Sequence, residues 1–350
     1  MERSEAKSLV VKAGLELVRS GLIARTWGNV SCRIDEETFA ITPSGREYQT
    51  LTADDIVEVK IKDLSWEGSI TPSSEKGVHG AVYRLRPDMN FVIHTHQENS
   101  SALSAAGLNY FRPSLSFSEL GKTVLCAKYA LPGTKALIRN VSDALEISES
   151  HAIILSHHGV LCFGQNYEGA FKASHQLEIA SGDFINENGG LIDIENPDSI
   201  RSLTGEARPV TDEERALGAA WEASGKKGYI LLNTDPDVVR FSKLGSVMKP
   251  LLDDFAQIVG TRIKTVKNDT RHIFPALGHV SAVMVKDLGA VCWGPCQRDA
   301  EAASMIVRKN CKAYFAASAF GRPQYIKPWE CLGMRRIYLY KYSKIAGENS

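Results

Sequence analysis

The stretch 90–96, Asn-Phe-Val-Ile-His-Thr-His, places two histidines at the end of an apolar run. A short apolar run of this kind is typical of a buried strand. Side chains two positions apart on a strand point to the same face, so His94 and His96 should project together. Two imidazoles supply half of a typical metal site, because a structural zinc has four protein ligands and a catalytic zinc has three and an open position.

A second apolar stretch, 152–159 (Ala-Ile-Ile-Leu-Ser-His-His-Gly), also ends in histidines and is the best donor of a third ligand. For a His-x-His pair alone, two ordinary polar residues at a strand end are an equally good interpretation. The second strand with the same ending, together with the motifs described next, favours a metal site.

The composition is that of a globular protein. The 350 residues, 43% of them hydrophobic and 23% charged, allow two domains with full cores. Basic and acidic residues number 41 each, so no basic field indicates nucleic acid, and no run approaches the roughly 18 apolar residues of a membrane span. The seven cysteines include no Cys-x-x-Cys pair, and the first residues lack the apolar core of a signal peptide. We therefore expect reduced thiols and a cytoplasmic protein.

Three short polar segments precede the histidines. They are residues 28–31 (Gly-Asn-Val-Ser), 42–45 (Thr-Pro-Ser-Gly) and 71–75 (Thr-Pro-Ser-Ser-Glu). Hydroxyls and unpaired backbone N–H groups in such segments, above all at a helix start, are suited to binding a phosphate. The alternative is that they are ordinary turn and cap residues.

Glu75 lies on the first turn of the helix predicted after the third segment. A carboxylate there can simply complement the helix dipole. Beside a metal it becomes a candidate proton-transfer base. Its position alone does not decide between the two roles.

The order of these motifs resembles the class II aldolase/adducin family over roughly residues 5–185. The motifs are Gly-Asn-x-Ser, Thr-Pro-Ser-Gly, Pro-Ser-Ser-Glu-x-x-x-His, His-Thr-His and His-Gly. The resemblance implies an α/β fold, namely a three-layer αβα domain with a mixed central sheet. It also implies a divalent metal, with zinc as the first candidate and manganese, iron and cobalt as alternatives.

Carried over position by position, the resemblance assigns roles to ten residues. The metal ligands are His94, His96 and His158; the phosphate-binding residues are Asn29, Ser44, Gly45, Ser73 and Ser74; the catalytic acid/base is Glu75; and Tyr110 is the candidate for a tyrosine proton donor. The family's tyrosine position falls near Ser114, so Tyr110 is either a stand-in or a packing residue. His157, next to His158, is not chosen.

The resemblance implies a lyase that cleaves a small phosphorylated ketose by a retro-aldol reaction. The metal would be a Lewis acid that stabilises the enediolate left when the C3–C4 bond breaks. Glu75 would move the proton, with a pKa raised by partial burial, and the phosphate loops would hold the remote end of the substrate. A sugar-acid phosphate decarboxylase or dehydratase, and a non-catalytic adducin-like scaffold, stay open as alternatives. The family also implies a homo-oligomer, and neither nucleic acid nor membrane is an expected partner.

The second half of the chain repeats the later part of the first. Residues 281–294 align with 151–164, both stretches continue into a helix, and 256–261 is matched to 129–134. In this alignment the three histidines that would bind metal fall opposite Leu232, Thr234 (or Asp235, if the register slips by one) and Leu288. A coincidental strand–turn–helix similarity is the alternative.

We therefore predict two domains, a catalytic domain over 1–200 and a degenerate, truncated αβα repeat over 205–350 that lacks metal ligands. One hypothesis for its role is that it takes a neighbour's place in the family's oligomer and supplies the proton donor, from Tyr229, Trp293 or residues 338–342. The tail 335–344 alternates like a strand.

Overall fold

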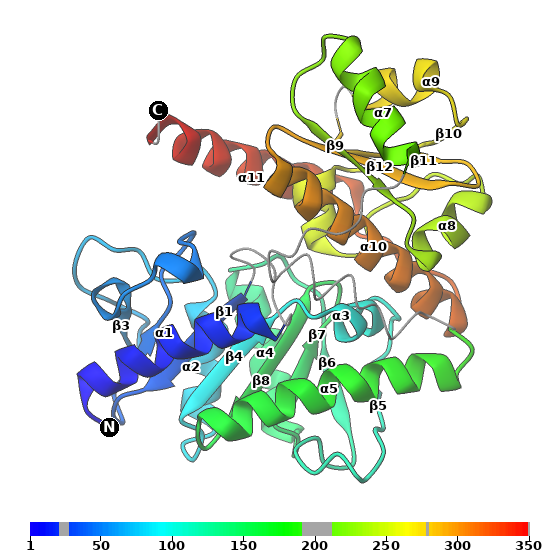
Figure 1. Cartoon of the computed structure of the whole chain (residues 1–350). Helices are drawn as coiled ribbons and strands as arrows, with labels where there is room; N and C mark the ends of the chain where they lie inside the picture. The colour runs from blue at the N-terminus through cyan, green and yellow to red at the C-terminus, as the bar shows by residue number, and fades with distance from the viewer. Residues whose placement is uncertain (21–27, 191–211, 278–279, 349–350) are drawn as a thin grey trace. The chain divides into compact units, whose positions relative to one another are not determined.

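The computed structural model describes residues 1–20, 28–190, 212–277 and 280–348. The chain forms two compact units, Met1–Gly189 and Gly190–Ser350 (Figure 1). The boundary predicted between residues 200 and 205 lies outside the described residues.

An eight-stranded mixed sheet is the middle layer of the first unit. Its strand order is β3-β2-β1-β4-β8-β7-β6-β5. The strands are β1 (Gly28–Arg33), β2 (Thr38–Ile41), β3 (Val57–Lys60), β4 (Phe91–Thr95), β5 (Tyr110–Phe111), β6 (Val124–Ala127), β7 (Ala152–Leu155) and β8 (Gly159–Gly164). Neighbouring strands are antiparallel except β6 and β7, which are parallel.

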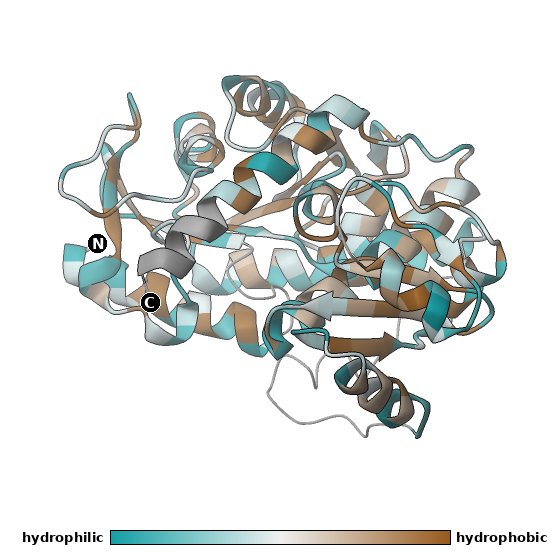
Figure 2. Cartoon of the chain, turned by 90° about the horizontal axis from the view of Figure 1, so that it is seen from above, coloured by the Kyte–Doolittle hydropathy of each residue, from teal (hydrophilic) through white to brown (hydrophobic). Residues whose placement is uncertain are grey.

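Helices cover both faces of this sheet. They are α1 (Arg3–Arg19), α2 (Lys76–Leu85), α3 (Glu98–Ser104), α4 (Lys135–Ile147) and α5 (Tyr167–Glu187). Apolar residues of α2 and α4 pack on one face, and those of α1 and α5 pack on the other. Every residue of β4, β7 and β8 is buried, as expected for a sheet covered on both sides. The strands that are visible in Figure 2 are brown, the colour of hydrophobic residues, over much of their length. The predicted three-layer αβα fold is confirmed.

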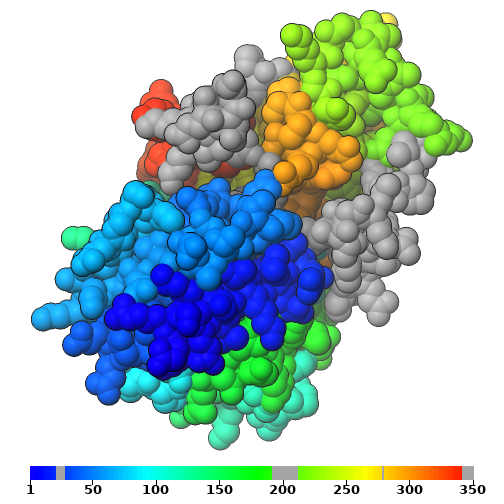
Figure 3. Space-filling view, turned by 60° about the vertical axis from the view of Figure 1, so that its left-hand side comes forward, coloured from blue at the N-terminus to red at the C-terminus, as the bar shows by residue number. Residues whose placement is uncertain are grey.

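Helix α1 shows how the sequence produces these layers. Its residues Ala6, Val10, Ala13 and Leu17 recur at three- or four-residue intervals, and none of them is exposed. The opposite side of the helix faces solvent, and α1 is visible in dark blue on the surface of the first unit in Figure 3.

The second unit contains a four-stranded sheet with the order β10-β11-β12-β9. Its elements are α7 (Asp212–Ala223), β9 (Tyr229–Asn233), α8 (Pro236–Lys243), a π-helix (Phe255–Val259), β10 (Thr265–Val266), α9 (Thr270–Ala276), β11 (Ala282–Val285), β12 (Gly289–Gly294), α10 (Gln297–Ala319) and α11 (Pro328–Glu348). Among the helices that the structure describes in either unit, none has the length and hydropathy that crossing a bilayer requires.

The pairing of the second sheet follows that of β4, β8, β7 and β6. Ala152 pairs with Cys162 between β7 and β8. Ala282 pairs with Cys292 between β11 and β12, and each of these two residues lies 130 positions after its counterpart in the first pair. On the other side, Ile93 of β4 lies opposite Cys162, and Leu231 of β9 lies opposite Cys292. One residue further, His94 therefore corresponds to a leucine in the second sheet.

Strand β9 lies at the edge of the second sheet, because none of the strands that the structure describes takes the place that β1 has beside β4. Edge strands expose unpaired N–H groups. The carboxylate of Glu214, which is 8% exposed, accepts the backbone N–H of Leu232 at 3.2 Å. A side chain from α7 thus satisfies a donor that a neighbouring strand would otherwise satisfy.

Two sequence-based expectations for the second half are wrong. The tail 335–344 lies in helix α11, not in a strand, and the helix begins at Pro328 because proline suits the first helical position. Residues 256–261 lie largely in the π-helix, which precedes β10, whereas 129–134 follows β6. The shared Gly-Thr pair of these two segments therefore does not mark equivalent positions.

Candidate metal centre

Three imidazoles meet at one end of strands β4 and β8. His94 lies on β4, His96 directly follows that strand, and His158 lies in the turn between β7 and β8. Their ring nitrogens lie within 4.8 Å of one another, and the Nε2 atoms of His94 and His96 are 3.1 Å apart. Among the described residues, no other cluster of three or more His, Cys, Asp or Glu side chains is placed to hold a metal.

The hydrogen bond of His94 leaves its other nitrogen available as a ligand. His94 Nδ1 donates to the carbonyl oxygen of Val160 at 2.8 Å, so Nε2 carries the lone pair that faces the other two histidines. Zinc–nitrogen bonds of about 2.0–2.1 Å in tetrahedral geometry set the ligand nitrogens about 3.3–3.4 Å apart. The three histidines therefore fit a zinc-type divalent ion.

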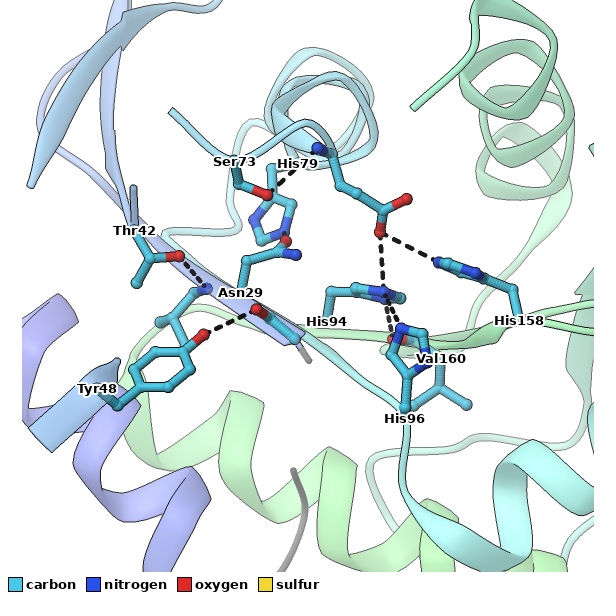
Figure 4. A network of polar contacts seen from close by, with 12 residues as sticks. Asn29, Thr42, Tyr48, Ser73, His79, His94, His96, His158 and Val160 are labelled. Atoms are coloured by element: carbon cyan, nitrogen blue, oxygen red, sulfur yellow. Dashed lines mark hydrogen bonds and ion pairs between the residues drawn. The ribbon is translucent and has the colours of Figure 1, made fainter. Parts of the chain in front are cut away.

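Glu75 lies at the start of α2 and points to the same place. Its Oε2 is 2.8 Å from His94 Nε2 and 3.2 Å from His158 Nε2 (Figure 4). Its other oxygen, Oε1, is buried and has no hydrogen-bond partner among the described residues. Buried carboxylate oxygens are rarely left unpaired, so a bound metal or substrate is the natural partner for this one.

The electrostatics of Glu75 differ from the sequence-based expectation. Burial acts to raise the pKa of this carboxyl, but His158 and His94 lower it more, so that the pKa lies well below its ordinary value. The predicted rise is wrong for this arrangement, because two imidazoles face one carboxylate oxygen.

The three polar segments lie side by side next to the histidines. Thr42 joins the first two, since its Oγ1 accepts the N–H of Val30 at 3.3 Å and its own N–H reaches the Val30 carbonyl at 3.1 Å. The second and third segments pair with each other: Ser44 N–H donates to Thr71 O, and Ser73 N–H donates to Thr42 O.

All five predicted phosphate residues lie on these joined segments. Asn29 and Ser73 are 6% exposed, whereas Ser44, Gly45 and Ser74 are exposed. Gly45 has φ of +74°, in the left-handed region that glycine adopts without strain. In the sheet Asn29 lies directly opposite His94, so their side chains share one face. The segments therefore form a polar wall next to the imidazoles.

The comparisons with known proteins agree with this geometry. The family model described as the Class II Aldolase and Adducin N-terminal domain matches residues 8–181. L-fuculose phosphate aldolase of Escherichia coli is 36% identical over 182 residues, which is 51% of this chain and 82% of the relative. The 5-deoxy-D-ribulose 1-phosphate aldolase of Bacillus thuringiensis is 31% identical over 173 residues, which is 49% of this chain and 80% of the relative.

The chain belongs to the class II aldolase and adducin family. A solved structure of L-fuculose 1-phosphate aldolase superimposes with a TM-score of 0.50 and 30% identity, covering 59% of this chain and 97% of that one. Because these relatives are named as aldolases, the predicted enzyme class, a class II aldolase-type lyase, is confirmed. The family match ends within the first unit, where the three histidines lie.

Tyr110 is not brought to the histidines of this class II aldolase within one chain. It lies on β5, one of the two outermost strands in the order of the sheet, and is 45% exposed. Strands β8, β7 and β6 separate β5 from β4, and at about 4.8 Å per strand this is roughly 19 Å. Its role as proton donor stays a prediction.

Sequence reasoning assigned no role to His79, although the motif Pro-Ser-Ser-Glu-x-x-x-His contains it. The structure places His79 on α2, fully buried, with Nε2 2.5 Å from Asn29 Oδ1. The signal was the position of His79 one helical turn after Glu75, on the same side of the helix.

Gly159 has no room for a side chain. A Cβ there would lie 2.4 Å from the carbonyl oxygen of Thr95 and 3.3 Å from the His96 ring. We expect Gly159→Ala to push β8 away from β4, to lower the free energy of unfolding by about 1–3 kcal/mol and to weaken metal binding. Thermal unfolding and metal content measure both effects.

Gly218→Ala is the matched control, because a Cβ at Gly218 on α7 meets nothing within 4 Å. It should leave metal content unchanged and stabilise its helix by up to about 1 kcal/mol. Equal metal content in wild type and Gly159→Ala would show that the close approach of the two strands does not position the histidines.

Proposed function

We propose that the chain is a divalent-metal-dependent lyase that cleaves a C–C bond of a small phosphorylated ketose by a retro-aldol reaction. The observation that carries the proposal is the meeting of three imidazoles and the Glu75 carboxylate beside a polar wall suited to phosphate. The two relatives named above as sugar-phosphate aldolases support this substrate class. We further expect a cytoplasmic homo-oligomer.

His94, His96 and His158 would hold the metal. Zinc is the first candidate, because imidazole nitrogens suit it, and manganese, iron and cobalt are alternatives. When bound, the ion supplies a Lewis acid that polarises substrate oxygens and favours the negative charge that develops on bond cleavage.

Glu75 would carry the proton. When the C3–C4 bond breaks, its electron pair stays on the three-carbon fragment, while the C4 hydroxyl loses its proton as the aldehyde forms. The buried Oε1 of Glu75, which has no hydrogen-bond partner among the described residues, would take up that proton and return it to C3, so that no proton is gained or lost by the site.

The polar wall would hold the phosphate away from the reacting bond. The hydroxyls of the exposed Ser44 and Ser74 and the backbone N–H of the exposed Gly45 are suited to an anion. Binding energy gained there would orient the C3–C4 bond against the Glu75 carboxylate, which is how remote groups accelerate a reaction.

Product analysis tests this function. The metal-loaded chain is incubated with L-fuculose 1-phosphate and 5-deoxy-D-ribulose 1-phosphate, with the unphosphorylated sugars as controls. We expect an aldehyde and a three-carbon ketose phosphate from at least one phosphorylated sugar, and none after chelation of the metal. No cleavage of any ketose phosphate contradicts the proposal. Release of carbon dioxide or water from sugar-acid or ketose phosphates would then indicate a decarboxylase or a dehydratase. A protein that binds no metal and turns over none of these compounds would indicate a non-catalytic scaffold.

We also propose that the second unit is a degenerate copy of the αβα unit. A hydrogen bond is also shared, besides the register. The Cys162 side chain is hydrogen-bonded to Ser174, and the Cys292 side chain is hydrogen-bonded to Ser304, each residue of the second pair lying 130 positions after its counterpart. A Cβ on either Gly164 or its counterpart Gly294 would collide with the start of the following helix. The positions that correspond to the metal ligands hold Leu232, Thr234 and Leu288, none of which suits zinc. We therefore expect one metal per chain.

A further inference from the structure

A buried chain of hydrogen bonds runs from α2 to Asn29. Tyr83 OH lies 2.7 Å from Ser31 Oγ, Ser31 Oγ lies 2.6 Å from His79 Nδ1, and His79 Nε2 lies 2.5 Å from Asn29 Oδ1. Tyr83 is 2% exposed, and Ser31 and His79 are not exposed at all.

The ends of this chain determine the direction of every bond in it. The Asn29 carbonyl oxygen can only accept, so His79 Nε2 carries the hydrogen. In a neutral imidazole Nδ1 then accepts, and the donor is the Ser31 hydroxyl, whose oxygen accepts from Tyr83. Burial lowers the pKa of His79 to about 3, in agreement with a neutral ring.

The opposite direction would leave a buried donor unused. It would require the Asn29 amide nitrogen to face His79, so that His79 Nδ1–H donates to Ser31 Oγ. The Ser31 and Tyr83 hydroxyls would then share a single contact, and among the described residues the hydrogen of one of them would have no acceptor. A buried unsatisfied donor costs about 1–3 kcal/mol, so the first direction is preferred.

The network leaves the Asn29 amide nitrogen free. With Oδ1 bound to His79, Nδ2 donates to no protein atom among the described residues. In Figure 4 the amide nitrogen lies on the side of Asn29 away from the His79 contact. Asn29 also shares its sheet face with His94, so its free N–H groups are close to the metal centre.

We propose that His79 is a positioning residue: its Nε2–H holds the Asn29 carbonyl, so that the Asn29 amide presents only N–H donors to the substrate phosphate. The proposal rests on the proposed function, because it needs a phosphate next to Asn29. The selectivity it predicts is simple. A group that accepts hydrogen bonds, such as a phosphate oxygen, is bound, and a group that only donates is not.

The test is a pair of variants that differ in where they place a donor. In His79→Gln the side-chain amide reaches the place of Nε2 and can still donate to Asn29, whereas the shorter amide of His79→Asn reaches only the place of Nδ1. Binding of inorganic phosphate to the metal-loaded full chain is measured by calorimetry. We expect an affinity within about threefold of wild type for His79→Gln and about ten- to a hundredfold weaker binding for His79→Asn.

Steady-state kinetics with L-fuculose 1-phosphate, if the wild type cleaves it, should show the same contrast. His79→Asn should raise KM with little change in kcat, because the lost interaction holds the phosphate equally in the ground state and the transition state. A purely structural role would instead give the two variants the same phosphate affinity, in proportion to any loss of stability.

The tautomer of His79 is observable in the wild type without any substitution. Nitrogen-15 spectra of histidine-labelled protein should show a neutral ring protonated on Nε2 at neutral pH. An Nδ1-protonated ring or a charged ring overturns the inference, as do equal phosphate affinities of His79→Gln and His79→Asn when the wild type binds phosphate. The wild-type protein could also bind no phosphate although its His79 is protonated on Nε2. That result would show that there is no phosphate site next to Asn29, and it would overturn the inference as well.

Discussion

Replacing His94 by alanine should remove the divalent metal from the protein and abolish its lyase activity. In the proposed site His94 would be the central ligand, because its Nε2 lies 3.1 Å from His96 Nε2 and its Nδ1 is held by the Val160 carbonyl. Two imidazoles cannot complete the three-ligand set of a catalytic metal. We expect metal content to fall from about one to near zero per chain and turnover to fall by about three orders of magnitude or more.

His272→Ala is the control for this substitution, because His272 is a half-exposed histidine on α9 of the second unit. It should keep both metal and activity. Elemental analysis gives the metal content, and circular dichroism shows whether each variant is folded. A folded His94→Ala protein that retained a full metal complement would place the metal elsewhere.

Replacing Glu75 by glutamine should separate metal binding from catalysis. Glutamine has the same shape as glutamate but cannot accept and return a proton at neutral pH. If the carboxylate carries the proton, kcat should fall by about 10²–10⁴-fold while metal content and KM stay close to those of wild type. The kcat and KM of both proteins are measured after metal loading, with the ketose phosphate that the wild type cleaves.

A surface carboxylate provides the matched control for Glu75→Gln. Glu58 on β3 pairs with Arg3 and Lys7, outside the metal centre, and its side chain is 26% exposed. Glu58→Gln should leave kcat unchanged. If Glu75→Gln lost the metal instead of the turnover, Glu75 would be a ligand, and the proton would have to move through another group.

The clustering of the three histidines could be predicted in part from local patterns. The two-residue period of a strand puts His94 and His96 on one face, and a second apolar strand offered a third ligand from His157 or His158. The resemblance then selected His158. The resemblance supplied what these patterns could not, namely the αβα layers. The layers depend on pairing between strands that are distant in sequence.

The remaining features depend on contacts that no local pattern shows. The hydrogen bonds of His79 reach residues about 50 positions away, and they exist only because α2 packs over β1. The pKa of Glu75 moved opposite to the expectation because burial was considered without the imidazoles that face it. In the tail, Pro328 was the local signal for a helix start, and the alternation of 335–344 concealed it.

Anomalous diffraction at the absorption edge of the bound metal tests the central claim most directly. Crystals of the metal-loaded chain should show one peak per chain, about 2.0–2.1 Å from the ring nitrogens of His94, His96 and His158, and none near Leu232 or Leu288. A peak bound by other residues, a second peak of equal height in the second unit, or no peak after metal loading would contradict a single metal-dependent lyase centre in the first unit.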